Sequence, residues 1–456
     1  MSIMNNALSG ALASQLALSA SSQNIANLQT KGYTRQSALL SAAGPNAGAN
    51  EAGNGVRVTS LMRFSDNYKT QQLWRTNSEL GARSQTQPYL TQLEQVMGDD
   101  ESNLSSGIDQ FFASLNAVAG VDPTSTPLRQ QVVTTGNLLA QRFNSLNNVF
   151  NAQLQSVRQQ ASAVLDSANA SIASIASLNA QIANANATGS NASSLIDARD
   201  QAIDSLASQM ALEVSDQPDG TRNVSLQSGQ SLVLGDVAGK LRVTGGAEQV
   251  FSLDFAGTNF QFDPTKAGGQ LGGLSSYVEN TLKPMQQGVA DIAQQIADKV
   301  NAQLAQGYAM DGTQGKPMFV FNNDGGSDLL SVVAGYQTSD LAFSGDGTPG
   351  DTGNLQKLVG IKSQSISVGT LGTVLISDAD TQLVGKLAVE SQQNKASLNT
   401  AQSMRDQANA DWQATSGVNQ DEEAVNLVEY QNMYQANMKV MSVANALFDA
   451  TLAMMA

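Results

Sequence analysis

The chain of 456 residues contains no cysteine and no histidine. These two absences exclude disulfide bonds, thiolate zinc sites, histidine metal ligands and every catalytic triad that is built on an imidazole. Most of the common enzyme chemistries are removed with them.

Positive charge is scarce as well. The chain has 24 Lys and Arg against 39 Asp and Glu, a formal net charge of −15, and no basic run accompanies its aromatic residues. A groove that follows nucleic-acid phosphates is therefore not expected. No stretch approaches the ~18 to 20 apolar residues that a membrane-spanning helix needs. We predict neither a nucleic-acid partner nor a membrane partner.

The first thirty residues carry no charge at all. Ala11-Leu12-Ala13 is similar to a small-residue cleavage site, but no Lys or Arg precedes it and polar residues interrupt the apolar run, so we predict no cleaved signal peptide. Desolvating an unpaired charge is costly, whereas Ser, Asn and Gln can exchange hydrogen bonds with their neighbours. A stretch without charge can therefore be surrounded by protein at little cost.

Helical periodicity marks both ends of the chain, with residues spaced alternately by three and four. In the N-terminal segment these positions are Met4, Leu8, Ala11, Gln15, Leu18, Ser22 and Ile25. In the C-terminal segment they are Ala424, Leu427, Gln431, Tyr434, Met438, Met441, Asn445, Phe448, Leu452 and Met455. The spacing predicts two helices that pair with each other or with other helices; the ordinary amphipathic faces of a monomeric bundle give the same pattern.

Between the ends the pattern changes from helix to strand and back. We predict a mainly α fold with inserted β structure: terminal helices paired as a coiled coil, an elongated helical bundle, and outer β-rich parts. The coiled-coil domain covers residues 1–64 and 405–456, with a strand and loop segment at 33–62. The bundle covers 65–210, 273–306 and 374–404, a β-rich insertion covers 211–272, and a region of loops and strands covers 307–373.

No segment predicts a catalytic, cofactor or metal site. Asp197, Arg199 and Asp200 are interpreted as a solvated helix face or a local ion pair of little energetic value. Gly345, Gly347 and Gly350 match the dinucleotide spacing, but Pro349 lies inside the match and no buried strand precedes it. One enzymatic alternative stays open, a carboxylate glycan hydrolase in the inserted region that holds Glu248 and Glu279.

A family resemblance is carried by NIANLQTKGYTRQ at residues 24–36, LIDARDQ at 195–201, GGQLGGL at 268–274 and the run from Ser416 to Ala450. Together they resemble the bacterial flagellar axial proteins, which include rod, hook and hook-associated subunits. The residues that carry the N-terminal signature are Asn24, Ile25, Asn27, Thr30, Gly32, Tyr33, Thr34 and Arg35. Gly32-Tyr33-Thr34-Arg35 favours the junction subunits of that family, with a hook or rod subunit as the alternative.

The resemblance implies a non-enzymatic protein of the extracellular flagellum, located between hook and filament and exported without a cleaved signal peptide. It implies as partners copies of the same chain in a ring, the hook protein, a second junction protein on the filament side, and an export chaperone that binds the C-terminal helix. On this view, the residues expected to pack between subunits are Leu8, Ala11, Leu18, Ile25, Leu427, Tyr434, Met438, Met441, Phe448 and Leu452.

Overall fold

The computed structural model describes residues 2–44, 53–99, 103–246, 249–323, 326 and 328–455. The chain folds into two compact units, each built from separate stretches of sequence. The first unit contains Met1–Leu80, Leu165–Asp263 and Ala401–Ala456, and the second contains Gly81–Val164 and Pro264–Thr400. The segment SAAGPNAGANEAGNG, which the sequence predicts to be a flexible connection, lies largely outside the described residues.

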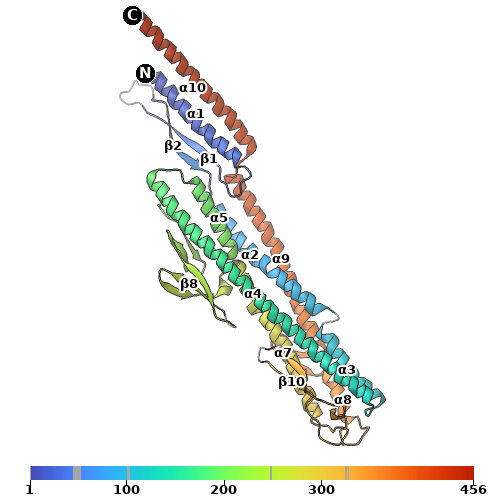
Figure 1. Ribbon diagram of the computed structural model, residues 1–456. Helices are drawn as coiled ribbons and strands as arrows, with labels where there is room; N and C mark the ends of the chain where they lie inside the picture. The colour runs from blue at the N-terminus through green and yellow to red at the C-terminus, as the bar shows by residue number, and fades with distance from the viewer. Residues whose placement is uncertain are drawn as a thin grey trace. The chain divides into compact units, whose positions relative to one another are not determined.

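Helices make up most of the chain (Figure 1). The α-helices are α1 Ser2–Ala26, α2 Asn67–Gly98, α3 Leu104–Val121, α4 Thr126–Thr188, α5 Ser193–Gln209, α6 Gly269–Tyr277, α7 Lys283–Leu304, α8 Gly353–Gly360, α9 Ile376–Ser416 and α10 Gln420–Met455. Short helical turns occupy η1 Pro264–Lys266, η2 Val278–Leu282, η3 Thr338–Asp340 and η4 Ile361–Ser363, of which η2 is a π-helical turn between α6 and α7.

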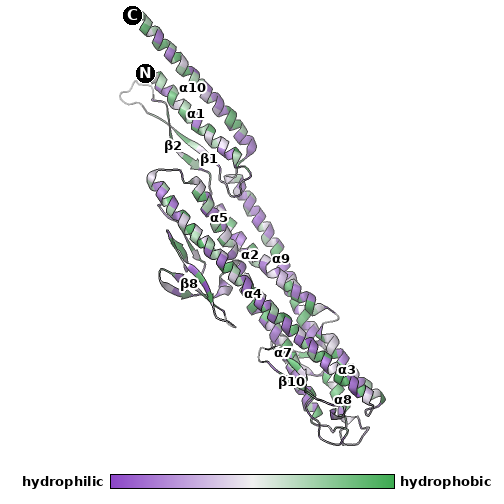
Figure 2. Ribbon diagram, in the orientation of Figure 1, coloured by the Kyte–Doolittle hydropathy of each residue, from purple (hydrophilic) through white to green (hydrophobic). Residues whose placement is uncertain are grey.

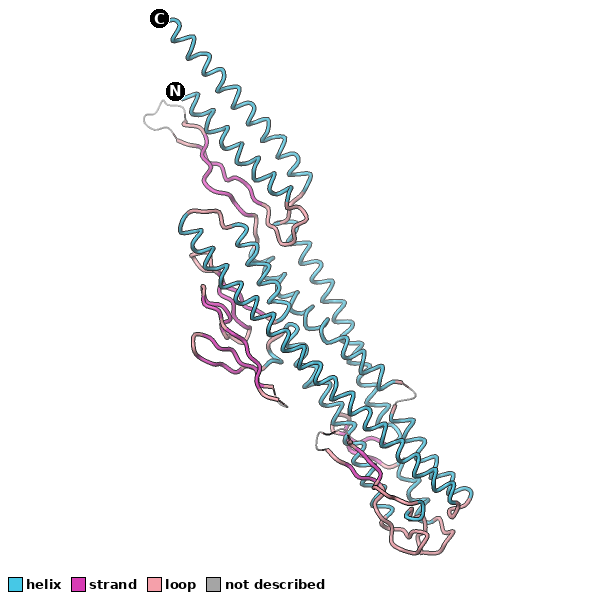
Figure 3. Tube along the Cα trace, in the orientation of Figure 1, coloured by secondary structure: helices cyan, strands magenta, loops and turns pink. Residues whose placement is uncertain are grey.

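The strands form small antiparallel sheets (Figure 3). The first unit has the hairpin β1 Gln36–Ala42 and β2 Val56–Arg63. Its other sheets are β3 Leu212–Asp216, β4 Arg222–Leu226, β5 Ser231–Leu234 and β6 Val237–Ala238, then β7 Lys240–Thr244, β8 Val250–Phe255 and β9 Thr258–Gln261. The second unit has the pairs β10 Phe319–Phe321 with β11 Leu330–Val332 and β12 Ser365–Val368 with β13 Gly372–Leu375. The predicted fold class, mainly α with inserted β, is confirmed.

In the first unit, α1 and α10 run side by side in opposite directions, so that the start of α1 lies near the end of α10 (Figure 1). The β1–β2 hairpin lies along α1, where the backbone N–H of Val56 donates to Ser9 Oγ at 3.2 Å. Asn419 caps α10, because its Oδ1 accepts from the backbone N–H groups of Asp421 at 3.0 Å and Glu422 at 3.4 Å.

Asparagine side chains on the helices tie the short strands down. Asn179 of α4 donates to the Arg222 carbonyl at 2.8 Å and accepts from the Arg222 N–H at 3.1 Å. Asn169 makes the same paired contact with the backbone of Leu241, and in the second unit Asn144 makes it with Leu330. Each amide thus replaces a neighbouring strand, which satisfies backbone groups that a small sheet leaves unpaired.

The second unit has a core of large apolar side chains. Phe143, Phe150 and Leu93 are fully buried, and the Phe111 ring meets Phe319 edge-on with centroids 5.5 Å apart. Burial of each such side chain contributes roughly 1.5 to 3 kcal/mol. The second unit therefore contains within itself the apolar contacts that hold a helical bundle together.

Candidate assembly site

The buried residues of α1 are all small or polar. They are Ala7, Ala11, Ala13, Ser14, Ala17, Ala20, Ser21 and Asn24. Most of the larger apolar side chains of the same helix are exposed, with Ile3 at 58%, Leu8 at 46% and Leu12 at 57% of their full accessible area, and Leu18 and Ile25 are only partly buried. An ordinary amphipathic helix in a globular protein buries its leucines and exposes its small residues. Helix α1 therefore reverses that rule.

Small residues let α1 and α10 approach closely. A Cβ atom added to Gly10 would lie 2.5 Å from Asn437 Oδ1, which is closer than real Cβ contacts allow. Farther along the pair, Ser21 Oγ donates to Glu423 Oε2 at 2.7 Å and Asn24 Nδ2 donates to Glu423 Oε1 at 3.0 Å. Glu423 is 3% exposed. The pair is thus joined by polar contacts at one end and by close packing of Gly10 against the Asn437 side chain in the middle.

The residues predicted to pack between subunits fall into two groups. Ala11 is buried, and the partly buried residues are Leu18, Ile25, Leu427, Tyr434 and Met441. The exposed residues are Leu8, Met438, Phe448 and Leu452, with Phe448 at 62% and Leu452 at 52%. Every residue from 445 to 455 is exposed, although apolar side chains continue to the last turn of α10 (Figure 2).

The segment after α1 is organised around one asparagine of the family signature. Asn24 Oδ1 accepts from the Tyr33 hydroxyl at 2.9 Å and from the Gln36 N–H at 3.0 Å, and its Nδ2 donates to the Gln36 carbonyl at 2.8 Å. Thr30 Oγ1 donates to Asn27 Oδ1 at 3.1 Å within the turn. The signature pattern of the sequence thus corresponds to a side-chain framework that fixes where β1 starts.

Gly32 has a geometric reason to be glycine. Its φ is +75°, a region that other residues rarely adopt, and a Cβ there would lie 2.6 Å from Gln201 Nε2. The neighbouring backbone is held by α5, since the Thr34 N–H donates to Asp197 Oδ2 at 3.2 Å. Arg35 binds Glu422 at 2.5 Å and lies over the Phe64 ring at 4.4 Å. The turn therefore contacts both α5 and the first turn of α10.

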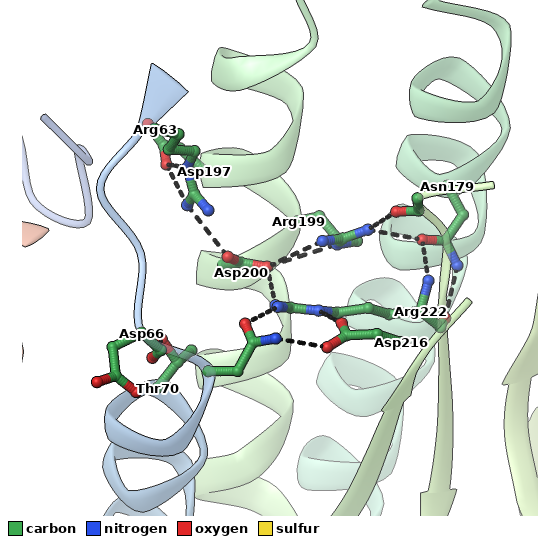
Figure 4. A network of polar contacts seen from close by, with 11 residues as sticks. Arg63, Asp66, Thr70, Asn179, Asp197, Arg199, Asp200, Asp216 and Arg222 are labelled. Carbon is green, nitrogen blue, oxygen red and sulfur yellow. Dashed lines mark hydrogen bonds and ion pairs between the residues drawn. The ribbon is translucent and has the colours of Figure 1, made fainter. Parts of the chain in front are cut away.

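A network of buried charges anchors the end of β2 (Figure 4). Arg63 donates from Nη2 to Asp197 Oδ1 at 2.5 Å and to Asp200 Oδ2 at 3.2 Å. Asp200 also accepts from Arg222 Nη1 at 2.5 Å, and Arg222 Nε donates to Asp216 Oδ1 at 2.6 Å. The network joins β2, α5, β3 and β4 within the first unit.

The interpretation of Asp197, Arg199 and Asp200 as a solvated helix face is wrong, although Arg199 does form the local pair with Asp200, at 3.4 Å. Asp197 is 6% and Arg199 is 2% exposed. The burial of Arg199 could have been predicted from the spacing, because Arg199 lies four residues before the buried Ile203 and hence on the same side of the helix. Arg63 and Arg222, which neutralise the aspartates, come from distant segments and could not be found by inspecting the motif alone.

Burial dominates the titration of these groups. It raises the pKa of Asp197, although Arg63 opposes the shift, and it lowers the pKa of Arg199 to about 10. Burial also raises the pKa of Tyr33 to about 12, with the negative charges of Asp197 and Glu423 adding to the effect. Tyr33 therefore stays neutral at physiological pH, and its hydroxyl donates a hydrogen bond to Asn24.

The structure assembles no metal cluster from the residues it describes, and none of their helices is long and apolar enough to cross a membrane. Of the two glutamates of the hydrolase alternative, Glu279 pairs with Lys283 one helical turn away, each side chain being 50% exposed. Glu248 lies outside the described residues. The best-defined feature of the first unit is thus a set of packing surfaces around a charged anchor.

Comparison with known proteins identifies the family. The profile described as the flagellar hook-associated protein FlgK helical domain matches residues 90–319, which is half of the chain. The chain belongs to the FlgK family of flagellar hook-associated proteins. A second profile, the C-terminal part of the flagellar basal body rod FlgEFG proteins, matches residues 413–454, which include all of α10 except its last residue.

Several FlgK relatives match nearly end to end. Flagellar hook-associated protein 1 of Salmonella typhimurium is 28% identical over 99% of both chains. The proteins of the same name from Escherichia coli and Bacillus subtilis are 27% and 26% identical, over 98% and 96% of this chain. The solved flagellar hook junction protein FlgK of Burkholderia pseudomallei is 26% identical with a TM-score of 0.52, and the match covers 55% of this chain and 47% of that one.

Proposed function

We propose that this protein is a non-enzymatic structural subunit that assembles through α1 and α10 at the junction between the flagellar hook and filament. The observation that carries the proposal is the reversed burial of α1, where Leu8 and Leu12 are exposed on a helix without a single charged residue. A hydrophobic patch of this kind on one protein usually marks an interaction site. Membership of the FlgK family supports the same location.

Assembly would add apolar burial to α1. Each leucine that moves from half exposed to buried gains of order 1 kcal/mol from apolar burial. The polar residues between them carry no net charge, so burying this helix against neighbours entails no desolvation of an ion. Assembly therefore supplies the apolar contacts that α1 lacks within its own chain.

The partners proposed follow from the family. They are copies of this chain in a ring, the hook protein, a second junction protein on the filament side, and an export chaperone that binds α10. The proposed location is the extracellular flagellum, reached by export without a cleaved signal peptide. A hook or rod subunit remains the second candidate, because a rod-protein profile matches the C-terminal segment. The hook-associated helical profile over residues 90–319 favours the junction.

Amide hydrogen exchange on the full-length protein tests the proposal, with the protein free and after addition to isolated hooks. In the free protein, residues 2–30 and 420–455 should exchange faster than the core of the second unit, and they should become more strongly protected on hooks. The Leu8→Asp variant should lose that protection. The matched control is Val121→Asp, which places the same charge at a 78% exposed apolar residue of the second unit and should bind hooks normally. Equal protection of both helices before and after binding would contradict the proposal.

A further inference from the structure

A groove runs between α1 and the β1–β2 hairpin of the first unit. It has a volume of about 570 Å³. Its lining residues come from one stripe of α1 and from β2: Ser9, Leu12, Ala13, Gln15, Leu16, Ser19, Val56, Arg57 and Val58. The largest apolar contributors from the helix are Leu12 and Leu16, which are 57% and 36% exposed. Arg57 is the one charged residue of the lining, and its side chain is exposed.

The last turns of α10 have the complementary character. Ser21 lies beside Glu423 and Gly10 beside Asn437, so the two helices pair in antiparallel register and residues 445–455 have no described residue of α1 opposite them. We call residues 445–455 the α10 overhang. Asp449 is its only charged residue. Its apolar side chains are exposed, with Phe448 at 62% and Leu452 at 52%.

Groove and overhang match in length and in spacing. The stripe from Ser9 to Ser19 and the overhang each span about 15 Å at ~1.5 Å per residue. Leu12 and Leu16 are one helical turn apart, as are Phe448 and Leu452, so each helix presents two large apolar side chains on one face. Asp449 lies next to that face, and Arg57 lines the other side of the groove. The sole charges of the two surfaces are therefore of opposite sign.

We infer that the α10 overhang of one subunit docks in the α1–β2 groove of a second copy, with Phe448 and Leu452 against Leu12 and Leu16 and with Asp449 facing Arg57. This inference rests on the proposed function and specifies its contact. Groove and overhang are different surfaces of the same chain, so the contact is heterologous and propagates from copy to copy into a ring or a helical array.

The absence of cysteine makes a direct test possible, since each introduced cysteine is the only one in its chain. Leu12→Cys protein and Leu452→Cys protein are mixed, added to isolated hooks and oxidised. The expected product is a disulfide-linked pair of the two variants. The matched control replaces Leu452→Cys with Leu447→Cys, which is 59% exposed but lies outside the face that carries Phe448 and Leu452. The control mixture should yield far less linked product.

Charge reversal tests the same contact without cysteine. Asp449→Arg and Arg57→Asp should each weaken incorporation onto hooks, by about two- to fivefold for an exposed ion pair of this kind. The double variant Asp449→Arg with Arg57→Asp should recover most of the loss. Lys439→Asp, on the same helix but outside the overhang, is the control that should leave incorporation nearly unchanged.

The outcomes separate the inference from the proposed function. If the unmodified protein fails to bind hooks with protection of α1 and α10, the proposed function is wrong. If it binds, but Leu452→Cys links no better than Leu447→Cys and the double charge variant shows no recovery, assembly uses other surfaces and the docking inference is overturned. A linked product with the mass of a hook subunit in place of a second copy would also overturn it.

Discussion

The terminal helix pair and the bundle of the second unit solve the burial problem in opposite ways. The bundle places Phe143, Phe150 and Leu93 in its interior with essentially no exposed surface. The helix pair of the first unit packs through Gly10, alanines and serines, and leaves Leu12 and Phe448 in solvent. The bundle thus carries its own apolar core, whereas under the function proposed above the exposed side chains of the pair are covered by another protein surface.

The largest effect is expected when a buried ring of the bundle and an exposed ring of the helix pair are truncated in the same way. Phe150→Ala removes a fully buried ring and should lower the free energy of unfolding by about 3 to 5 kcal/mol. The same truncation at the 62% exposed Phe448 should change it by less than about 0.5 kcal/mol. Urea unfolding of the free protein, followed by far-ultraviolet circular dichroism, measures both. A loss of more than ~1 kcal/mol from Phe448→Ala would mean that the α10 overhang is already packed in the free chain.

The next effect compares buried and exposed ion pairs. Asp197→Ala leaves the guanidinium of Arg63 without its main partner in a largely buried place, so we expect a loss of about 3 kcal/mol. The matched change Glu279→Ala breaks a pair whose side chains are each 50% exposed, and should cost less than about 0.5 kcal/mol. Thermal unfolding monitored by circular dichroism gives both values. Equal losses of stability in the two variants would show that the network does not anchor β2.

The sequence predicted the helices better than it predicted their faces. The three-and-four spacing identifies the helices at both ends, and Leu427, Tyr434 and Met441 are partly buried as a seam requires. On α1 the buried side is defined by alanine and serine, which carry almost no hydrophobic signal. The spacing therefore assigned Leu8 and Leu18 to the packing face, although Leu8 is exposed. Spacing patterns are defined by large apolar residues, whereas close packing of two helices requires small ones.

The buried network around Asp197 and Asp200 was not predicted from the sequence. A short Asp–Arg–Asp run on a helix usually faces solvent, and only long-range partners can make its burial tolerable. Here Arg63 comes from β2 and Arg222 from β4. Glu423 is a similar case, because helix capping explains an acidic first turn but does not reveal that Ser21 and Asn24 bind this carboxylate. Such contacts are set by tertiary structure.

A smaller effect is expected at the closest approach of the terminal pair. Gly→Ala in a helix interior normally stabilises by about 1 kcal/mol. In this chain Gly10→Ala should give no gain, because the new methyl group meets the amide of Asn437 at 2.5 Å. In an Asn437→Ala background the gain should return. Urea unfolding of the four proteins in this cycle measures the coupling, and additive effects would show that the helices are farther apart than described.

The smallest effect concerns pH and the turn that joins α1 to β1. The pKa of Tyr33 is raised to about 12, mainly by burial. Its neutral form is therefore favoured by folding, and the corresponding stability is complete below about pH 10 and declines as the pH approaches 12. Tyr33→Phe removes this dependence along with the bond to Asn24. The free energy of unfolding is measured at pH 9 and again near pH 11.5. The variant should be less stable than the unmodified protein at pH 9 and should lose less stability between the two pH values.

Burial also raises the pKa of Tyr277 and Tyr336, and these residues are present in both proteins. Only the difference in stability between the unmodified protein and the variant therefore reports on Tyr33. Parallel curves would place the Tyr33 hydroxyl in solvent and the turn outside the packed part of the first unit.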